Sequence, residues 1–195
     1  GMQTSDRFVS LIIRDSAYKE KYQNWGNRDW SYHNYRNSDI DTYEKIALEL
    51  AKKGYWVFRM GKAVHKPFKA DHHRILDYAN SGYRSDFLDI WLMANCFFTI
   101  STGTGLDCVN SAFRRPTVFV NHLPVGDCST PGSTKFIYLF KHLKWKSTGN
   151  YLSLSEQIDS GAIHFLRTND FVENGIEIVD NTAQEIYETA FEMEM

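Results

Sequence analysis

The stretch CFFTISTGTGLDCVNSAFRRPTVFVN, residues 96–121, holds two apolar runs with a glycine-rich turn and a short amphipathic segment between them. The first run, Cys96–Ser101, is short, continuous and rich in β-formers, which predicts a strand buried on both faces. The segment after the turn repeats its apolar residues at helical spacing and ends before Pro116. The second run, Thr117–Asn121, predicts another strand. Two strands joined through one helix lie parallel, so this stretch predicts an α/β fold.

A second unit of the same kind precedes this stretch. Phe8–Ile13 and Tyr55–Met60 are apolar runs that predict strands, and residues 39–53 between them present one apolar face at helical spacing. Ser38 is the predicted N-cap of that helix, and Gly54 fits the position just after its end. This unit therefore also predicts a parallel pair of strands.

The remaining segments extend the pattern to the C-terminus. Further strands are expected at 74–79 and 136–140, and a short extended piece at 175–179. Further helices are expected at 86–94, after the capping box of Ser153 and Glu156, and after the predicted N-cap Asn181. Residues 1–195 are thus predicted to form a single Rossmann-like, doubly wound α/β domain. Its sheet should be mostly parallel, with about five or six strands and helices on both faces.

Residues 16–37 interrupt the first unit with a long polar and aromatic loop. A loop of this length inside a compact domain is uncommon and is usually functional or disordered, and its many aromatic residues argue against disorder. A loop hanging free in water would expose a large apolar surface. We therefore expect this segment to fold over the mouth of a cleft.

The composition narrows the classes of partner. The net charge is −2 and no block of basic residues is present, so nothing indicates a nucleic-acid partner. The three cysteines, Cys96, Cys108 and Cys128, lack the spacing of a disulfide framework or a zinc site. No apolar run approaches the roughly 20 residues of a membrane span, and no signal peptide is recognisable. These features predict a cytoplasmic protein without a membrane span.

Polar residues that directly follow the predicted strands form the candidate site. In open parallel sheets, ligands bind in the crevice beyond the carboxyl ends of the strands. This criterion selects Arg14, Asp15, Arg59, Gly61, Asp77, Tyr78, Ser101, Thr102, Gly103, Thr104, Gly105 and Asn121. The set combines two arginines, a glycine-rich turn and an amide, which suits a phosphate-bearing ligand.

The turn Ser101–Gly105 has two interpretations. Because it opens a helix, its free backbone N–H groups and the helix dipole favour an anion, and its glycines allow close approach. Alternatively, Thr104 and Asp107 form a capping box and the glycines only turn the chain. The carboxylate of Asp107 in the first turn also counts against an anion. The turn matches neither a Walker loop nor a GxGxxG motif.

Arg14 and Arg59 close predicted buried strands, a position that favours a functional role for an arginine. The alternative is an ion pair that ties loops together, for instance Arg14 with Asp77. Three histidines between the second and third predicted strands match no standard metal spacing, so neither a metal nor another cofactor is expected. The chain also has no GxSxG motif for nucleophilic catalysis.

The segment Asp89–Asn121 resembles the donor-binding half of GT-B glycosyltransferases and their epimerase relatives. In those proteins a helix, a strand, a Ser/Gly turn and a second helix follow one another, and a proline precedes the next strand. The resemblance implies that Ser101–Gly105 holds the donor diphosphate. A GT-B enzyme has two Rossmann-like domains, and this chain is long enough for one, so the resemblance implies the donor-binding half.

Most of the chain resembles one group of bacterial glycosyltransferases linked to surface-polysaccharide loci. The matching pieces are Ile13-Arg14-Asp15 with Tyr18, Tyr35-Arg36-Asn37, GYWVFRMG at 54–61, IVDNTAQE at 178–185 and Phe191-Glu192-Met193. The pair Arg14-Asp15 is similar to the first strand of fucosyltransferase-like enzymes, whose arginine contacts the diphosphate of a GDP-sugar. This similarity implies that Arg14 and Asp15 are catalytic.

The leading hypothesis is a glycosyltransferase domain that binds a nucleotide-diphosphate sugar. It would transfer the sugar to a glycan or lipid-linked acceptor in surface polysaccharide or glycoconjugate synthesis. The base and ribose are expected near Arg59 and Tyr78, and the diphosphate on the turn with Arg14 opposite, in place of the usual metal. One alternative is a non-catalytic module that binds a nucleotide or phosphoglycan. Another is a nucleotide-sugar epimerase relative.

Overall fold

The main sheet is parallel throughout and contains the predicted strands. The computed structural model describes residues 1–22, 29–128 and 135–194. Within these residues the strand order is β3-β2-β1-β4-β5-β6, and each neighbouring pair is parallel. The strands are β1 (Phe8–Ile12), β2 (Trp56–Arg59), β3 (Ile75–Leu76), β4 (Phe98–Ser101), β5 (Thr117–His122) and β6 (Phe136–Phe140). This is the strand order of the Rossmann fold, so the predicted fold class is confirmed.

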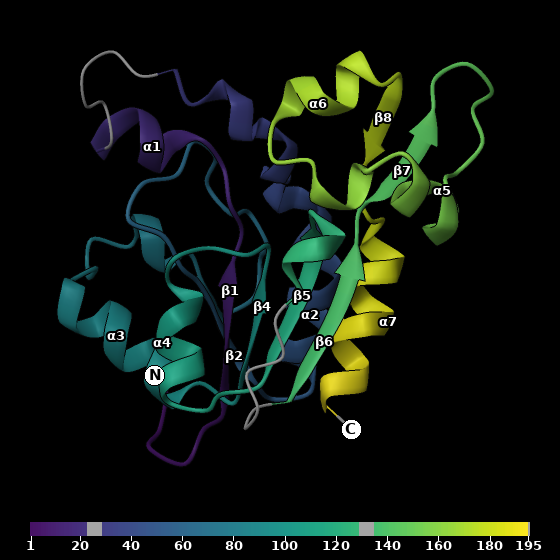
Figure 1. The fold of residues 1–195 in the computed structure, drawn as a ribbon. Helices are drawn as coiled ribbons and strands as arrows, with labels where there is room; N and C mark the ends of the chain where they lie inside the picture. Colours follow the sequence, from purple (N-terminus) through teal and green to yellow (C-terminus); the bar gives the residue numbers. More distant parts are fainter. Residues whose placement is uncertain (23–28, 129–134, 195) are drawn as a thin grey trace.

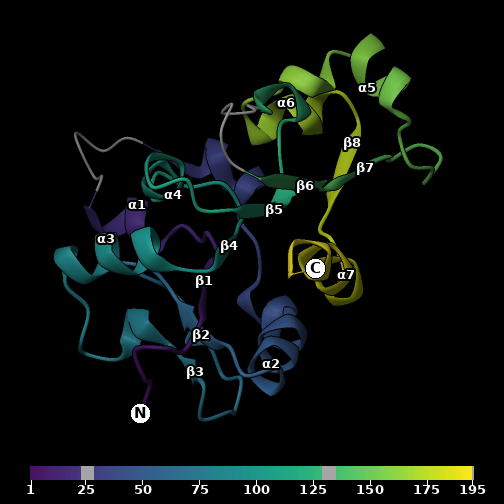
Figure 2. The same ribbon diagram turned by 90° about the horizontal axis from the view of Figure 1, so that it is seen from below.

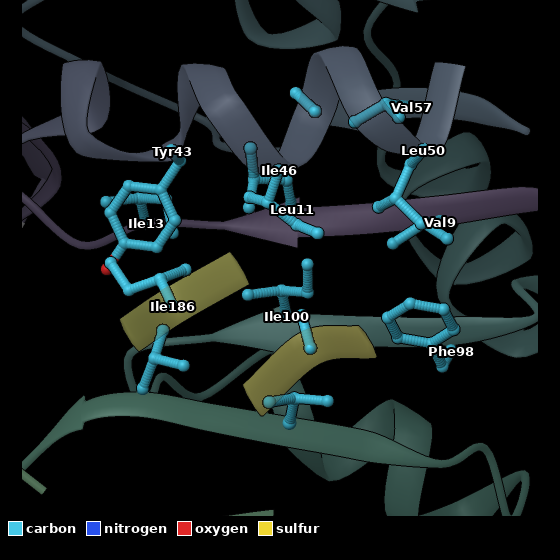
Figure 3. Close-up of a cluster of buried hydrophobic side chains, with 14 of the residues drawn as sticks. Val9, Leu11, Ile13, Tyr43, Ile46, Leu50, Val57, Phe98, Ile100 and Ile186 are labelled. Carbon is cyan, nitrogen blue, oxygen red and sulfur yellow. The ribbon is translucent and has the colours of Figure 1, made fainter. Parts of the chain in front are cut away.

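Helices cover both faces of the main sheet (Figures 1 and 2). On one face lie α2 (Glu44–Lys52) and α7 (Ala183–Glu194), which pack against each other and against the strands. Figure 3 shows Leu11 of β1 together with Ile46 of α2 and Ile186 of α7, all fully buried. The contact is apolar because side chains alternate along β1 and repeat every three to four residues on the helices.

The opposite face of the sheet is covered by α3 (Asp86–Asn95) and α4 (Asp107–Ala112). Phe8 and Ile12 of β1 point to this side, where Leu92 and Met93 of α3 join their cluster. The N-cap of α3 is Ser85, whose side chain accepts a hydrogen bond from a backbone N–H inside the first turn. Successive side chains of β1 thus point alternately into two hydrophobic cores, one on each face of the sheet, which explains its continuous apolar sequence.

Two short 3-10 helices follow strands of the main sheet, η4 (Tyr78–Asn80) after β3 and η5 (Val125–Asp127) after β5. The strand predicted at 74–79 is therefore shorter than expected. The cause is Asp77, whose Oδ2 accepts hydrogen bonds from the Phe68 backbone N–H (2.9 Å) and the Asn80 side chain (2.7 Å) and so turns the chain.

A second, smaller sheet lies beyond the end of the main sheet (Figure 1). It pairs β7 (His142–Trp145) with β8 (Ile176–Val179) in antiparallel fashion. Between these strands the chain forms α5 (Leu154–Asp159), η6 (Ala162–His164) and α6 (Thr168–Glu173). The capping box predicted at the start of α5 is present. These elements share their own apolar cluster, separate from the two cores of the main sheet.

The segment 16–37 was expected to be a loop, and this expectation is wrong for its described part. It contains α1 (Ala17–Tyr22) and the 3-10 helix η2 (Ser31–Arg36); residues 23–28 lie outside the described residues. An aspartate starts each helix: Asp15 accepts from the Ala17 N–H (3.0 Å), and Asp29 accepts from the Ser31 N–H (2.8 Å). Such local side-chain bonds begin helices that have no apolar periodicity to reveal them.

The helix η2 is anchored to the second sheet through Tyr35. Its ring is buried and lies 5.6 Å from the ring of Phe171, measured between centroids. Its backbone N–H donates to Oγ1 of Thr168 (3.2 Å). This part of the aromatic segment is therefore packed against α6.

Both predicted N-caps are wrong. The helix α2 is preceded by η3 (Ile40–Tyr43), whose N-cap is Asp39 and not Ser38. At the start of α7 the capping side chain is Thr182, which accepts from the backbone N–H of Glu185 (3.2 Å), and not Asn181. The sequence contains two adjacent candidates at each place, and tertiary contacts decide between them.

Ser38 and Asn181 both bind Asn121 at the end of β5. The backbone N–H of Asn121 donates to Oδ1 of Asn181, and the backbone N–H of Asn181 donates to Oδ1 of Asn121, each at 2.6 Å. The Nδ2 of Asn121 donates to the hydroxyls of Ser38 (2.9 Å) and Tyr43 (3.0 Å). Asn121 has a φ of 51°, a left-handed conformation that asparagine tolerates better than most residues. This buried network joins β5 to the starts of α2 and α7.

Candidate functional site

A cleft of about 680 Å³, here called the main cleft, opens at the carboxyl ends of β1 and β2. Its walls come from the end of β1, from the loop after β2, from the start of α4, and from α1 and α3. The lining residues that follow the strands are 12–15, 60–64 and 104–106. This is the edge of the sheet at which a Rossmann-like fold places ligands.

A smaller hollow of about 330 Å³ adjoins the main cleft. It is lined by Arg14, Ser16, Lys19, Glu20, Asp29, Trp30, Ser31, Asn34 and Asn37. Arg14 and Lys19 line both spaces. The described part of the aromatic segment thus forms part of the wall of the candidate site.

Arg14 lines both the main cleft and the smaller hollow. It follows β1 directly, and its backbone N–H donates to Oγ1 of Thr102 (2.9 Å), which holds the strand end against the turn after β4. Within the described residues its guanidinium forms no ion pair with a carboxylate. Burial, together with the nearby charge of Arg36, lowers the pKa of Arg14 to about 10. An anion in the cleft would relieve both effects.

Arg36 lies close enough to Arg14 for its charge to act on it, although it lines neither the main cleft nor the smaller hollow, and the strand-end criterion missed it. It belongs to η2, and its Nη2 donates to the carbonyl of Gly103 (2.8 Å). Its Nε is buried and has no hydrogen-bond partner among the described residues. The residue stands in the motif Tyr35-Arg36-Asn37 of the family resemblance, which was the one signal for it in the sequence.

Only part of the turn Ser101–Gly105 lies in the main cleft. Thr104 and Gly105 line the cleft, whereas Ser101, Thr102 and Gly103 are buried behind it. The carboxylate of Asp107 accepts from the Thr104 N–H and from the Ser101 hydroxyl (3.0 Å). The structure therefore contains the aspartate contact of the capping interpretation, and several turn N–H groups are already bonded within the chain.

The polar interior behind the turn holds two titratable side chains near Arg36. Burial raises the pKa of Asp107 to about 6, partly offset by its hydrogen bonds and by the charge of Arg36. Burial, together with the charge of Arg36, lowers the pKa of His122 to about 4. Neither ring nitrogen of His122 has a hydrogen-bond partner among the described residues. At neutral pH the histidine beside Arg36 is therefore neutral.

Replacing Gly103 by alanine is expected to lower the free energy of unfolding more than the same replacement does at a left-handed glycine with free space around it. Gly103 has a φ of 80°, and a Cβ would lie 3.2 Å from Nδ1 of His122 and 3.3 Å from Nη2 of Arg36. Gly82 has a φ of 78° and nothing within 4 Å of a Cβ. Gly82→Ala should lose about 1–2 kcal/mol of unfolding free energy through backbone strain alone, and Gly103→Ala about 1–2 kcal/mol more through the contacts.

Urea unfolding of the two glycine variants measures this difference. Equal losses in Gly103→Ala and Gly82→Ala would show that Arg36 and His122 move away freely and that Gly103 is not needed to seat them.

Two predicted site residues lie in the main cleft beside Arg14. The carboxylate of Asp15 accepts from two backbone N–H groups, those of Ala17 (3.0 Å) and His65 (2.8 Å). Gly61 has a φ of 148°, and a Cβ there would lie 2.8 Å from a methyl carbon of Val64. Asp15 thus joins α1 to the loop after β2, and Gly61 lets that loop turn closely.

Arg59, Tyr78 and Asn121 do not reach the main cleft, so their expected place in it is wrong. Arg59 is only 1% exposed, and its Nη1 donates to Oδ1 of Asp77 (3.1 Å). Tyr78 is buried, and its hydroxyl accepts from the Ser85 backbone N–H (3.1 Å). Asn121 belongs to the network at the end of β5. The loop-tying ion pair considered for Arg14 exists, but its arginine is Arg59.

Over residues 1–22, 29–128 and 135–194, no three side chains of His, Cys, Asp or Glu are grouped as a metal ion would need. In the same ranges, no helix combines the length and apolar character needed to cross a membrane.

Comparison with known proteins supports the fold. No protein-family model matches the sequence, and no curated protein sequence matches it. The chain is similar to the crystal structure of the glycosyl transferase family 9 from Veillonella parvula DSM 2008, with a TM-score of 0.54 and 13% sequence identity. The match covers 99% of this chain and 47% of that one, so this chain spans about half the length of that protein. At this identity the similarity shows a shared glycosyltransferase-like fold.

Proposed function

We propose that this chain is the donor-binding domain of a glycosyltransferase and that its main cleft binds a nucleoside-diphosphate sugar. One observation carries the proposal. Arg14 lines the main cleft at the end of β1, is largely shielded from water, and has no carboxylate partner within the described residues. A partly buried cation without a counter-ion favours an anionic ligand. The fold shared with a glycosyl transferase family 9 protein agrees with this proposal.

In this proposal the arginines act on the leaving group. When the sugar departs, negative charge grows on the diphosphate, and fixed cations near it lower the barrier. Arg36 is held in place by the carbonyl of Gly103 (2.8 Å), and Arg14 is held through its backbone bond to Thr102 (2.9 Å). For the second substrate we propose a glycan or lipid-linked acceptor of surface polysaccharide or glycoconjugate synthesis, as the family resemblance implies.

Asp15 takes a positioning role in this proposal. Both of its carboxylate oxygens accept backbone N–H groups, so it shapes the walls around Arg14. Because both oxygens of Asp15 are already hydrogen-bonded, the second candidate function, a nucleotide-binding module without catalysis, is also favoured. The time course of nucleoside diphosphate release from a bound donor separates the two, because a pure binding module releases none.

A thermal-shift screen against UDP-, GDP- and CMP-sugars tests the proposed ligand. At a ligand concentration of about 100 times Kd, binding adds about 2.7 kcal/mol to stability. For a chain of this size this corresponds to a rise in Tm of about 5–10 °C. The free sugars at equal concentration are the control and should leave Tm unchanged. A flat response to every nucleotide sugar at millimolar concentration would contradict the proposal.

A further inference from the structure

The main cleft and the smaller hollow have different walls. Apolar side chains from β1, from the residue after β2, from α3, and from α4 and its N-cap line the main cleft; they include Ile12, Met60, Ile90, Leu106 and Val109. The charged side chains that also line it are Arg14, Asp15, Lys19, Lys62, Arg84, Asp86 and Asp89. The residues that line the smaller hollow carry hydroxyl, carboxylate, amide, ammonium and guanidinium groups, and the one aromatic residue among them is Trp30. The larger space therefore suits a flat, largely apolar group, and the smaller space suits a polyhydroxylated one.

The boundary between the two spaces is cationic. Arg14 and Lys19 line both of them, and the ammonium of Lys19 lies 4.4 Å from the centroid of the Trp30 ring. A guanidinium can donate to oxygens on more than one side because its N–H groups point along several directions of one plane. A ligand that extends from one space to the other must pass Arg14, so its most negative part belongs there.

We propose that the smaller hollow is the glycosyl subsite of the donor, with the nucleoside in the main cleft and the diphosphate beside Arg14 at the boundary. This inference rests on the proposed function and assigns the direction in which the donor lies. The reverse direction would put the nucleoside, the larger and more apolar end, into a polar space of about 330 Å³ and leave the sugar in the apolar space of about 680 Å³.

Two amides of the hollow supply the groups that sugar hydroxyls need. The Nδ2 of Asn37 donates to Oδ1 of Asn34 (3.2 Å). The Nδ2 of Asn34 and the Oδ1 of Asn37 have no hydrogen bond among the described residues, so the pair keeps one donor and one acceptor. A hydroxyl both donates and accepts, and neighbouring hydroxyls on a sugar ring match such a pair.

Isothermal titration of one donor and its parent nucleotide tests the assignment. The probes are the UDP- or GDP-sugar selected by the thermal-shift screen and the corresponding UDP or GDP. Asn34→Ala removes an exposed amide and keeps the backbone bond from Asn37 to the Asn34 carbonyl. We expect this substitution to weaken binding of the nucleotide sugar about three- to tenfold, the effect of one hydrogen bond. The affinity for the free nucleotide should change by less than about twofold. Asn150→Ala, an exposed amide at the tip of the β7 turn, is the matched control and should change neither affinity.

The outcomes separate the two proposals. In one outcome, the wild-type chain binds both the nucleotide and the nucleotide sugar, while Asn34→Ala weakens the binding of both equally or of neither. In that case the assignment of the glycosyl subsite is overturned and the proposed function stands. If the wild-type chain binds neither probe, the proposed function fails and the subsite assignment fails with it. A selective loss for the nucleotide sugar supports the assignment.

Discussion

Arg14→Ala is expected to weaken binding of the nucleotide sugar by about 10- to 150-fold. The estimate is the loss of a hydrogen bond to a charged group, about 1.5–3 kcal/mol. Arg14→Lys should recover only part of this affinity, because an ammonium cannot reproduce the bidentate geometry of a guanidinium on a diphosphate. Isothermal titration of the two variants gives the comparison directly.

The stability of Arg14→Ala should equal or exceed that of the parent protein. Burial and the charge of Arg36 both lower the pKa of Arg14, to about 10, so the charged side chain is disfavoured in the folded chain without a ligand. The bond to Thr102 uses the backbone N–H of Arg14 and survives the substitution. Arg7→Ala, an exposed arginine just before the same strand, is the control and should leave affinity unchanged.

Arg14 would be a structural residue if the opposite pattern appeared. A lower Tm with unchanged affinity for nucleotide sugars would mean that its guanidinium ties the loops together. The glycosyltransferase proposal would then lose the residue that carries it.

Asn121→Ala should lower the free energy of unfolding by about 3–5 kcal/mol. The substitution removes the bonds from Nδ2 to Ser38 and Tyr43 and leaves the buried backbone N–H of Asn181 without its acceptor. Each lost bond costs about 1 kcal/mol, and an unsatisfied buried group costs about 1–3 kcal/mol more. A residue with a φ of 51° adds backbone strain when it becomes alanine. In a chain of this size Tm should fall by about 6–20 °C.

Asn121→Gly separates the loss of the hydrogen bonds from the backbone strain. It loses the same side-chain bonds but relieves the left-handed strain, so it should be about 1 kcal/mol more stable than Asn121→Ala. Asn150→Ala, an exposed amide, is the control for removing an asparagine and should change stability by less than about 0.5 kcal/mol. A loss below about 1 kcal/mol in Asn121→Ala would mean that water replaces the network and that Asn121 does not hold β5 to α2 and α7.

Local patterns in the sequence were sufficient to predict the main sheet. The runs that became β1, β4 and β5 are short, apolar and bounded by turn residues, and each strand formed close to its predicted position. The helix α1 was missed because its start depends on one side-chain bond from Asp15 and not on apolar periodicity. The separation of β8 from the main sheet was also not visible, since pairing between strands is not a local property.

Sequence position selected Arg14 and Arg59 on equal terms, as polar residues at the ends of buried strands. Only the fold distinguishes them: Arg59 meets Asp77 in the interior, whereas Arg14 lies in the main cleft beside a second arginine. Arg36 follows no strand, and its role depends on η2 being packed against the turn at Gly103.

The sequence by itself determined the fold class and the edge of the sheet at which the main cleft lies, because burial of apolar side chains is encoded by their spacing along the chain. The tertiary structure alone decided which polar groups face the cleft. Whether Asn121 or Asp107 meets a ligand or another side chain depends on groups distant in sequence that come close only after folding. A buried polar group takes whichever partner lies within hydrogen-bond distance, and no pattern of neighbouring residues records that distance.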